Sequence, residues 1–259
     1  LVGSEMCIRD SSLGKLHESI DYFNNQKVQF TVNLGDIIDR DQKDLDSVLI
    51  CLKHLNKKIF HTTGNHDYKG ITDNKVLYKK LKMPSEYYSF MKKNWVFVFL
   101  NTNEIAAYSN VVGTAKEQEL LRIQNQIKVN KEIQGARWNG GVSSRQLQWL
   151  DNLLKKSEKK NRNVLIFCHH PLYPRSQFTA LNNMEILDVI NRYNCVKAIF
   201  SGHHHSGAFG YFDHIPCNTV EGMIETPDKN SFGIVRIYKD RIELEGKERM
   251  TSRLFMLQP

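Results

Sequence analysis

The chain contains few cysteines, few prolines and no long hydrophobic run. Its 259 residues include five cysteines and six prolines, and no two cysteines form a C-x-x-C pair. An odd, widely spaced set of cysteines argues against a disulfide framework and predicts free thiols in a reducing compartment, so we expect a cytoplasmic protein. No apolar run approaches the roughly 20 residues of a membrane-spanning helix, and no secretory signal pattern is present. These features argue against a membrane-bound or disulfide-stapled protein.

The chain is basic, with a net charge of +8 and an isoelectric point of about 9.1. A basic chain can attract nucleic acid or membrane surfaces, or it can carry solvated lysine faces. Because no basic run is interleaved with aromatic residues, we favour solvated faces and expect neither a nucleic-acid nor a membrane partner. A positive surface also suits a small anionic substrate, on which we expect the chain to act as a monomer.

The composition is that of an ordinary globular protein, with 41% hydrophobic and 25% charged residues. No internal repeat or low-complexity linker divides the chain, so we expect a single domain over residues 11–259. Residues 1–10 lack hydrophobic periodicity and do not join naturally to the helix predicted after them. We therefore expect a non-native or disordered piece there.

Predicted strands and helices alternate along most of the chain, which is typical of an α/β fold. The predicted helices span residues 11–25, 44–56, 72–82, 116–134, 143–156 and 181–193. The predicted strands span residues 28–34, 58–62, 87–91, 95–100, 164–168, 196–201, 232–238 and 241–246.

Residues that can bind metal follow four of these strands. Loops at the carboxyl ends of strands build the sites of α/β folds, so residues distant in sequence can converge there. Asp, Asn and His are ligands suited to Mn, Fe or Zn, and four such segments predict a two-metal phosphoester hydrolase. The segments read G-D-I-I-D at 35–39, G-N-H-D at 64–67, C-H-H-P at 168–171 and G-H-H-H at 202–205.

Each segment offers one or two candidate ligands. A carboxylate such as that of Asp36 can bridge two cations, although an aspartate can also merely cap a turn. Asn65 offers a neutral carbonyl oxygen, and His169 is the first polar residue after its strand. His203 and His205 point to one side of an extended segment, whereas a lone histidine is more often structural.

His66 and Asp67 are predicted to act in catalysis. Because neighbouring side chains diverge, His66 would face the substrate rather than share the ligand position of Asn65. As an imidazolium it could protonate the leaving oxygen or stabilise charge on phosphate, with Asp67 orienting it. The alternative is a plain surface-loop histidine. His170 would lie behind the ligands or be exposed.

These motifs resemble those of the calcineurin-like metallophosphoesterase superfamily, whose pattern includes G-D-x-x-D, G-N-H-[DE], a lone His and G-H-x-H. Three further segments are similar to the manganese-dependent ADP-ribose/CDP-alcohol diphosphatase family. The resemblance implies an α/β fold, a four-layer β-sandwich flanked by helices. The further segments are W-N-G-G at 138–141 with Q-L-Q-W-L at 146–150, H-P-L-Y-P at 170–174, and E-G-M-I-E-T-P at 221–227.

The resemblance also implies a role for each candidate residue. Asp36 would bridge two divalent ions, most simply Mn, with Fe, Zn, Co or Mg as alternatives. Asn65, His169 and His203 would complete one site, and His205 would belong to the other. The loop Asn139-Gly140-Gly141 would offer backbone N–H groups to the substrate. The family cleaves the pyrophosphate of ADP-ribose, CDP-alcohols and related nucleotides, and ADP-ribose would give AMP and ribose 5-phosphate.

The chain departs from the superfamily pattern at its start, where D-x-H or D-x-Q on a first strand is lacking. We therefore expect the first strand to be missing and the second ion to keep only Asp36 and His205. Three alternatives remain: another phosphoesterase of this fold, such as a phosphomonoesterase or cyclic-nucleotide phosphodiesterase, a non-catalytic scaffold, and a nucleic-acid-binding module. A scaffold has no need of Asn65, His66 and His205, which argues against it.

Overall fold

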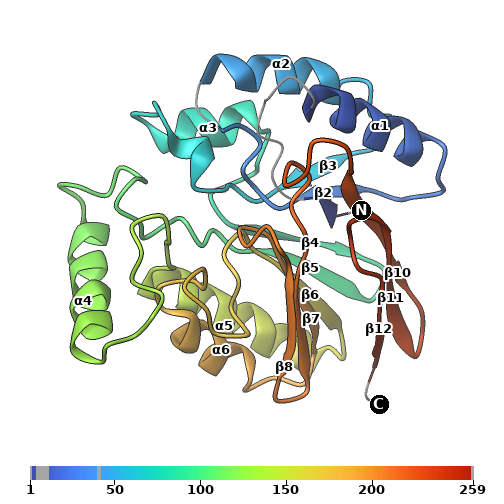
Figure 1. Ribbon diagram of the computed structural model, residues 1–259. Coiled ribbons are helices and arrows are strands. Elements are labelled where there is room, and N and C mark those ends of the chain that lie inside the picture. The colour runs from blue at the N-terminus through green and yellow to red at the C-terminus, as the bar shows by residue number, and fades with distance from the viewer. Residues whose placement is uncertain (1, 4–11, 40–41, 258–259) are drawn as a thin grey trace.

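Two six-stranded sheets face each other in the computed structural model, which describes residues 2–3, 12–39 and 42–257 (Figure 1). The first sheet has the order β12-β11-β10-β1-β2-β3, and the second has the order β4-β5-β6-β7-β9-β8. The strands are β1 (Val2–Gly3), β2 (Thr31–Asn33), β3 (Ile59–His61), β4 (Tyr88–Lys92), β5 (Trp95–Phe99), β6 (Asn163–Phe167), β7 (Val196–Ser201), β8 (Ala208–Phe212), β9 (Ile215–Thr219), β10 (Ser231–Ile237), β11 (Arg241–Glu248) and β12 (Arg253–Met256).

Helices cover the outer faces of both sheets, so the predicted four-layer α/β sandwich is confirmed (Figure 1). The first sheet is covered by α1, α2 and α3, and the second by α5 and α6, while α4 stands at one side. The helices are α1 (Ser12–Asn24), α2 (Gln42–Leu52), α3 (Asn74–Lys80), α4 (Ala115–Val129), α5 (Ser144–Lys159) and α6 (Asn183–Ile190), with a 3₁₀ turn at His66–Tyr68.

An aromatic core fills the space between the sheets. Phe60 of the first sheet stacks on Phe90 of the second, with ring centroids 4.0 Å apart. Phe99 and Phe167 stack in turn at 5.1 Å. The middle strands β5, β6 and β7 run parallel and are buried on both faces, which explains their continuous apolar sequences. This rigid double layer fixes where the strand ends lie.

A two-residue strand corrects the prediction that the first strand is missing. Strand β1 lies between β2 and β10, parallel to the former and antiparallel to the latter. Without it, the facing edges of β2 and β10 would leave backbone N–H and C=O groups unpaired, a cost that any short extended segment can remove. Residues 1 and 4–10 of the predicted N-terminal piece lie outside the described residues.

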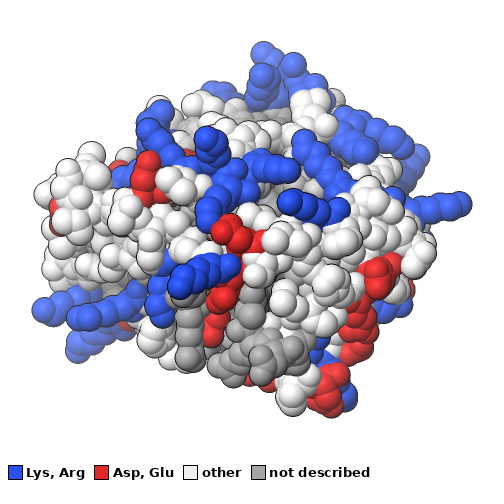
Figure 2. All heavy atoms as spheres, turned by 90° about the horizontal axis from the view of Figure 1, so that it is seen from above, with Lys and Arg blue, Asp and Glu red and all other residues white. Residues whose placement is uncertain are grey.

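The four described cysteines are free, as the sequence predicts, and all four are buried. Burial raises the pKa of Cys195 and Cys217 to about 12, so these thiols stay protonated at neutral pH. The described part of the chain contains no helix suited to crossing a membrane, its longest helix α5 having 16 residues. Figure 2 shows the face covered by α1, α2 and α3, where Lys and Arg side chains are widely scattered and Asp and Glu form smaller groups.

Candidate metal centre

Four predicted ligands from both sheets converge at the carboxyl ends of β2, β3, β6 and β7. His169 Nε2 lies 3.1 Å from Asn65 Oδ1, 3.1 Å from His203 Nδ1 and 3.3 Å from Asp36 Oδ2. His169 and Asp36 are fully buried and His203 is nearly so. The sandwich thus brings together side chains that are up to 167 positions apart, the difference between 203 and 36.

The hydrogen bonds behind the two histidines show which ring nitrogens face the cluster with a lone pair. The Nδ1–H of His169 donates to the Leu34 carbonyl oxygen at 2.7 Å, because a carbonyl can only accept. The Nε2–H of His203 donates to Asn139 Oδ1 at 3.0 Å. Burial, followed by the charges of neighbouring histidines, lowers the pKa of His203, so its ring is neutral. Acceptor atoms therefore face one another across a short gap.

This arrangement fits a divalent cation. Two ligands bound to one ion at about 2.1 Å and at right angles lie about 3.0 Å apart, close to the separations around His169 Nε2. Converging lone pairs repel one another unless a positive charge lies between them. Two imidazole nitrogens, an amide oxygen and a carboxylate oxygen suit Mn²⁺ and neighbouring transition metals.

Glycines let the two motif loops approach closely. A Cβ on Gly64 would lie 2.0 Å from Asp36 Oδ1, inside the contact distance of any two atoms. Gly35 adopts a φ of +98°, and a Cβ there would lie 2.5 Å from the Gly64 nitrogen. The glycine in each motif is therefore needed to seat the Asp36 carboxylate beside Asn65.

Asp67 does not orient His66, which corrects the predicted catalytic pairing. The buried Asp67 carboxylate accepts hydrogen bonds from the backbone N–H groups of Gly64 and Ile37, both at 2.8 Å. It also accepts from the N–H groups of Asp36 and Ile38. Burial and the charge of Asp36 raise the pKa of Asp67. Consecutive side chains diverge on the 3₁₀ turn, so Asp67 points inward and joins the two motif loops.

Asp39 takes the place predicted for Asp67. The Nδ1–H of His66 donates to the Asp39 backbone oxygen at 2.9 Å and lies 3.2 Å from Asp39 Oδ1. The backbone N–H of His66 donates to Asp36 Oδ1 at 2.8 Å. His66 is therefore held beside the ligand cluster with its Nε2 as the ring nitrogen that carries the lone pair.

A hollow of 480 Å³ opens beside the cluster. His205 lines it and is half exposed, and its Nδ1 lies 2.6 Å from Glu225 Oε2. The sequence pattern predicted no role for Glu225. The residues that line the hollow are Asp36, Asn65, His66, Trp138, Phe178, His203, His204, His205, Ser206 and Glu225.

The loop Asn139-Gly140-Gly141 lies behind the ligands rather than in the hollow. All three residues are buried, and the N–H of Gly141 donates to the Ile105 oxygen at 2.8 Å. Asn139 supports His203 through the hydrogen bond from the His203 ring. These contacts favour a supporting role over the direct substrate contact predicted for the loop, and Trp138, next in the chain, lines the hollow instead.

His170 also supports the cluster from behind. Its Nε2–H donates to the Trp138 carbonyl at 3.2 Å, and its backbone N–H donates to Thr102 Oγ1 at 3.0 Å. Burial, then the neighbouring charge of His169, lowers the pKa of His170 to about 3. Of the two predicted positions for His170, the buried one is therefore confirmed.

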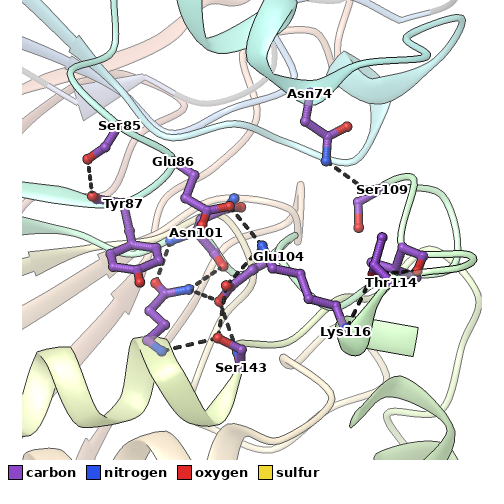
Figure 3. A network of polar contacts seen from close by, with 12 residues as sticks. Asn74, Ser85, Glu86, Tyr87, Asn101, Glu104, Ser109, Thr114, Lys116 and Ser143 are labelled. Carbon is purple, nitrogen blue, oxygen red and sulfur yellow. Dashed lines mark hydrogen bonds and ion pairs between the residues drawn. The ribbon is translucent and has the colours of Figure 1, made fainter. Parts of the chain in front are cut away.

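A buried polar network behind the site was not predicted (Figure 3). The Glu104 carboxylate accepts from the Ser143 N–H at 2.9 Å and from Gln146 Nε2 at 2.6 Å, and Lys116 Nζ lies 3.0 Å away. Ser143 caps α5 by accepting from the Gln146 N–H, and its own N–H donates to Glu104 rather than to the Gln146 side chain. The network thus ties α4 and α5 to the loop after β5.

Comparison with known proteins agrees with this geometry. Residues 9–207 match the family described as calcineurin-like phosphoesterase. The chain is 30% identical to a protein of Bos taurus named manganese-dependent ADP-ribose/CDP-alcohol diphosphatase, over 94% of this chain and 84% of that one. A protein of Oryza sativa with the same name is also 30% identical, over 96% of this chain and 86% of that one.

Solved structures show the same fold. A dimetal phosphatase from Danio rerio superposes with a TM-score of 0.91 at 24% identity, covering 99% of this chain and 98% of that one. GAP50, described as the anchor in the inner membrane complex of Plasmodium, superposes with a TM-score of 0.61 at 12% identity. That alignment covers 100% of this chain and 88% of the other.

Proposed function

Because this chain belongs to the calcineurin-like phosphoesterase family, we propose that it hydrolyses the pyrophosphate bond of ADP-ribose, CDP-alcohols and related nucleoside diphosphate compounds. ADP-ribose would then give AMP and ribose 5-phosphate. The observation that carries the proposal is the convergence of three acceptor atoms on His169 Nε2 at 3.1–3.3 Å. The names of the relatives supply the substrate class.

The centre would take two divalent ions, manganese being the metal named for the relatives. Asp36, Asn65, His169 and His203 would hold one ion, and Asp36 with His205 would hold the other. When bound, such ions polarise the phosphoryl oxygens and neutralise the charge that develops on them.

His66 would act on the substrate directly. Its Nδ1–H is occupied by Asp39, so a second proton on Nε2 could be donated to the leaving phosphate oxygen. An imidazolium there would also stabilise charge on the phosphate. Because the backbone N–H of His66 donates to Asp36 Oδ1, the His66 ring is kept next to the ligand cluster.

Aromatic side chains around the hollow favour a planar base. The ring of Phe178 stacks on His204 with centroids 4.5 Å apart and a tilt of 19°. Trp138, also at the hollow, is 47% exposed and presents a broad apolar face. Stacking on such faces is how proteins commonly hold bases without reading their edges.

We also propose that the chain works as a cytoplasmic monomer on small molecules, without nucleic-acid or membrane partners. Buried free thiols support a reducing compartment. The lysines scattered over the α1–α3 face support a solvated surface rather than one dedicated groove for nucleic acid (Figure 2).

The test is Mn²⁺-dependent release of AMP from ADP-ribose, compared with CDP-choline, a phosphomonoester and a cyclic nucleotide. We expect hydrolysis of the two pyrophosphates and little of the others. Selective phosphomonoester hydrolysis would favour a phosphatase. Tight manganese binding without hydrolysis of any substrate would favour the scaffold.

A further inference from the structure

His205, the one predicted ligand outside the buried cluster, contacts the carboxylate of Glu225. Glu225 Oε2 lies 2.6 Å from His205 Nδ1, and the backbone N–H of Gly222 donates to the His205 oxygen at 2.9 Å. A histidine that donates its Nδ1–H to a carboxylate keeps its lone pair on Nε2, which sets the nitrogen available to a metal. The position of Glu225 therefore determines which ring nitrogen of His205 carries the lone pair.

Glu225 lies in a segment without helix or strand. Residues 223–228 form turns and bends in the connection between β9 and β10, and the Glu225 side chain is 42% exposed. Nothing in the local sequence dictates this path, so contacts with the rest of the fold must hold it.

Lys15 of α1 supplies those contacts. Its side chain is nearly buried, and its Nζ donates to the carbonyl oxygens of Met223 at 3.0 Å and Lys229 at 2.6 Å. It donates to the Thr226 carbonyl as well. Three carbonyls on both sides of Glu225 thus satisfy one ammonium group, which is the condition for burying such a charge.

We propose that Lys15 and Glu225 are positioning residues for His205: Lys15 fixes the 223–229 segment, and Glu225 then fixes the His205 ring with Nε2 as the metal-binding nitrogen. The proposal rests on the proposed metal-binding function, because it gives His205 a ligand role. Neither residue is expected to touch the substrate's reacting atoms. Partners of this kind typically change metal affinity by about 10- to 100-fold when removed.

The test reads the tautomer of His205 in the metal-free protein. Long-range ¹H–¹⁵N NMR spectra of ¹⁵N-histidine-labelled protein distinguish Nδ1–H from Nε2–H rings, and His205→Asn assigns the signal. The spectra are recorded at increasing pH until the ¹⁵N shifts no longer change, so that the neutral ring is the form observed. We expect the Nδ1–H form in the wild-type chain.

Two variants separate the two residues. Glu225→Leu should shift His205 toward the Nε2–H form that an unrestrained imidazole prefers, and Lys15→Met should shift it in the same direction by less. The double variant should match Glu225→Leu alone, because Lys15 acts through Glu225. Asp213→Asn, at a second exposed carboxylate–histidine pair 3.2 Å apart, should leave His205 unchanged.

An Nε2–H ring in the wild type, or no change in Glu225→Leu, overturns the proposal. A shift in Glu225→Leu but none in Lys15→Met removes Lys15 from it. Because Glu225 is partly exposed, its variant keeps the test valid if Lys15→Met does not fold. Electron paramagnetic resonance of added Mn²⁺ is recorded on the same samples. Absence of any tightly bound ion would overturn the proposed function. The tautomer would still decide whether Glu225 and Lys15 position the His205 ring.

Discussion

Asn139 aims its side-chain oxygen at His203 Nε2 from 3.0 Å. The orientation of this amide is settled by its other end, because Asn139 Nδ2 donates to the carbonyls of Gln134 at 2.8 Å and Gln177 at 2.7 Å. An amide so fixed can only accept from His203, which leaves the ring's Nδ1 lone pair facing the other ligands. The ring of His203, a proposed metal ligand, is thus oriented by a residue that does not line the hollow.

Replacing Asn139 by Leu should lower manganese affinity by about 10- to 100-fold, because His203 loses the partner that fixes its ring. Isothermal titration with Mn²⁺ measures this directly. Asn130→Leu, at the exposed end of α4, serves as the matched control and should leave affinity unchanged. Equal affinities in the wild type and Asn139→Leu would contradict the supporting role.

Replacing His66 by Asn should lower kcat by roughly 10²- to 10⁴-fold while bound manganese stays the same. The reason is that His66 lies beside the ligands, with Asp39 on its Nδ1, and does not belong to the cluster around His169. Steady-state kinetics with metal analysis of the same sample tests this. Loss of manganese together with activity would make His66 a ligand instead.

Replacing Asp67 by Asn should destabilise the fold by about 3 kcal/mol, because an amide nitrogen would face backbone N–H groups that now have a carboxylate acceptor. Urea denaturation gives the free energy of unfolding. Asp39→Asn is the comparison, since it keeps the backbone oxygen to which His66 Nδ1–H donates, and it should change stability by much less. The reverse ranking would contradict the role of Asp67 in joining the two motif loops.

Replacing Glu104 by Leu should lower the free energy of unfolding by about 3–5 kcal/mol, because it strips a buried network of its acceptor (Figure 3). In that variant a second change, Lys116→Met, should cost less than in the wild type, because the contact with Glu104 is already gone while the one with Glu86 at 2.9 Å remains. A double-mutant cycle in urea measures this coupling. Additive effects of the two changes would show that the contact between Lys116 and Glu104 contributes nothing of its own.

Acid should destabilise the protein partly through His61. Burial lowers the pKa of His61 from 6.5 to about 4, so the folded state resists protonation that the unfolded chain accepts. Stability from this group is complete above pH 6.5 and is lost as the pH falls toward 4. Between pH 7 and pH 5 the wild type should lose about 2 kcal/mol more than His61→Leu. Identical pH dependence in both proteins, followed by urea denaturation, would exclude His61.

The positions of the candidate ligands followed from the sequence because each lies just after a strand of clear hydrophobic pattern. Within each sheet, the rule that parallel strands end at one edge pairs Asp36 with Asn65 and His169 with His203, and the packing of the two sheets then brings the pairs together. Their supporting residues did not follow from it. Asp39 and Asp67 stand three residues and two residues from their nearest ligand, and which of them meets His66 depends on a 3₁₀ turn that the sequence pattern does not reveal.

Supporting contacts over longer distances were harder still to predict. Glu225 meets His205 across 20 residues, and Glu104 meets Ser143 across 39. Both glutamates look like ordinary surface residues in the sequence, yet one contacts the His205 ring and the other is buried. Such pairings depend on loop paths between elements, for which hydrophobic periodicity carries no information.

The contacts of Lys15 join parts of the chain separated by 208 to 214 positions. During synthesis, α1, β2 and β3 leave the ribosome long before residues 223–229, whose carbonyl groups Lys15 binds. Until the residues before β10 have been made, Lys15 remains exposed to water. His205 likewise lacks its contact with the Glu225 carboxylate until then. Shortened chains that stop before residue 223 should be poor at completing this part of the centre however well their helices form, because they lack the carbonyls that Lys15 binds.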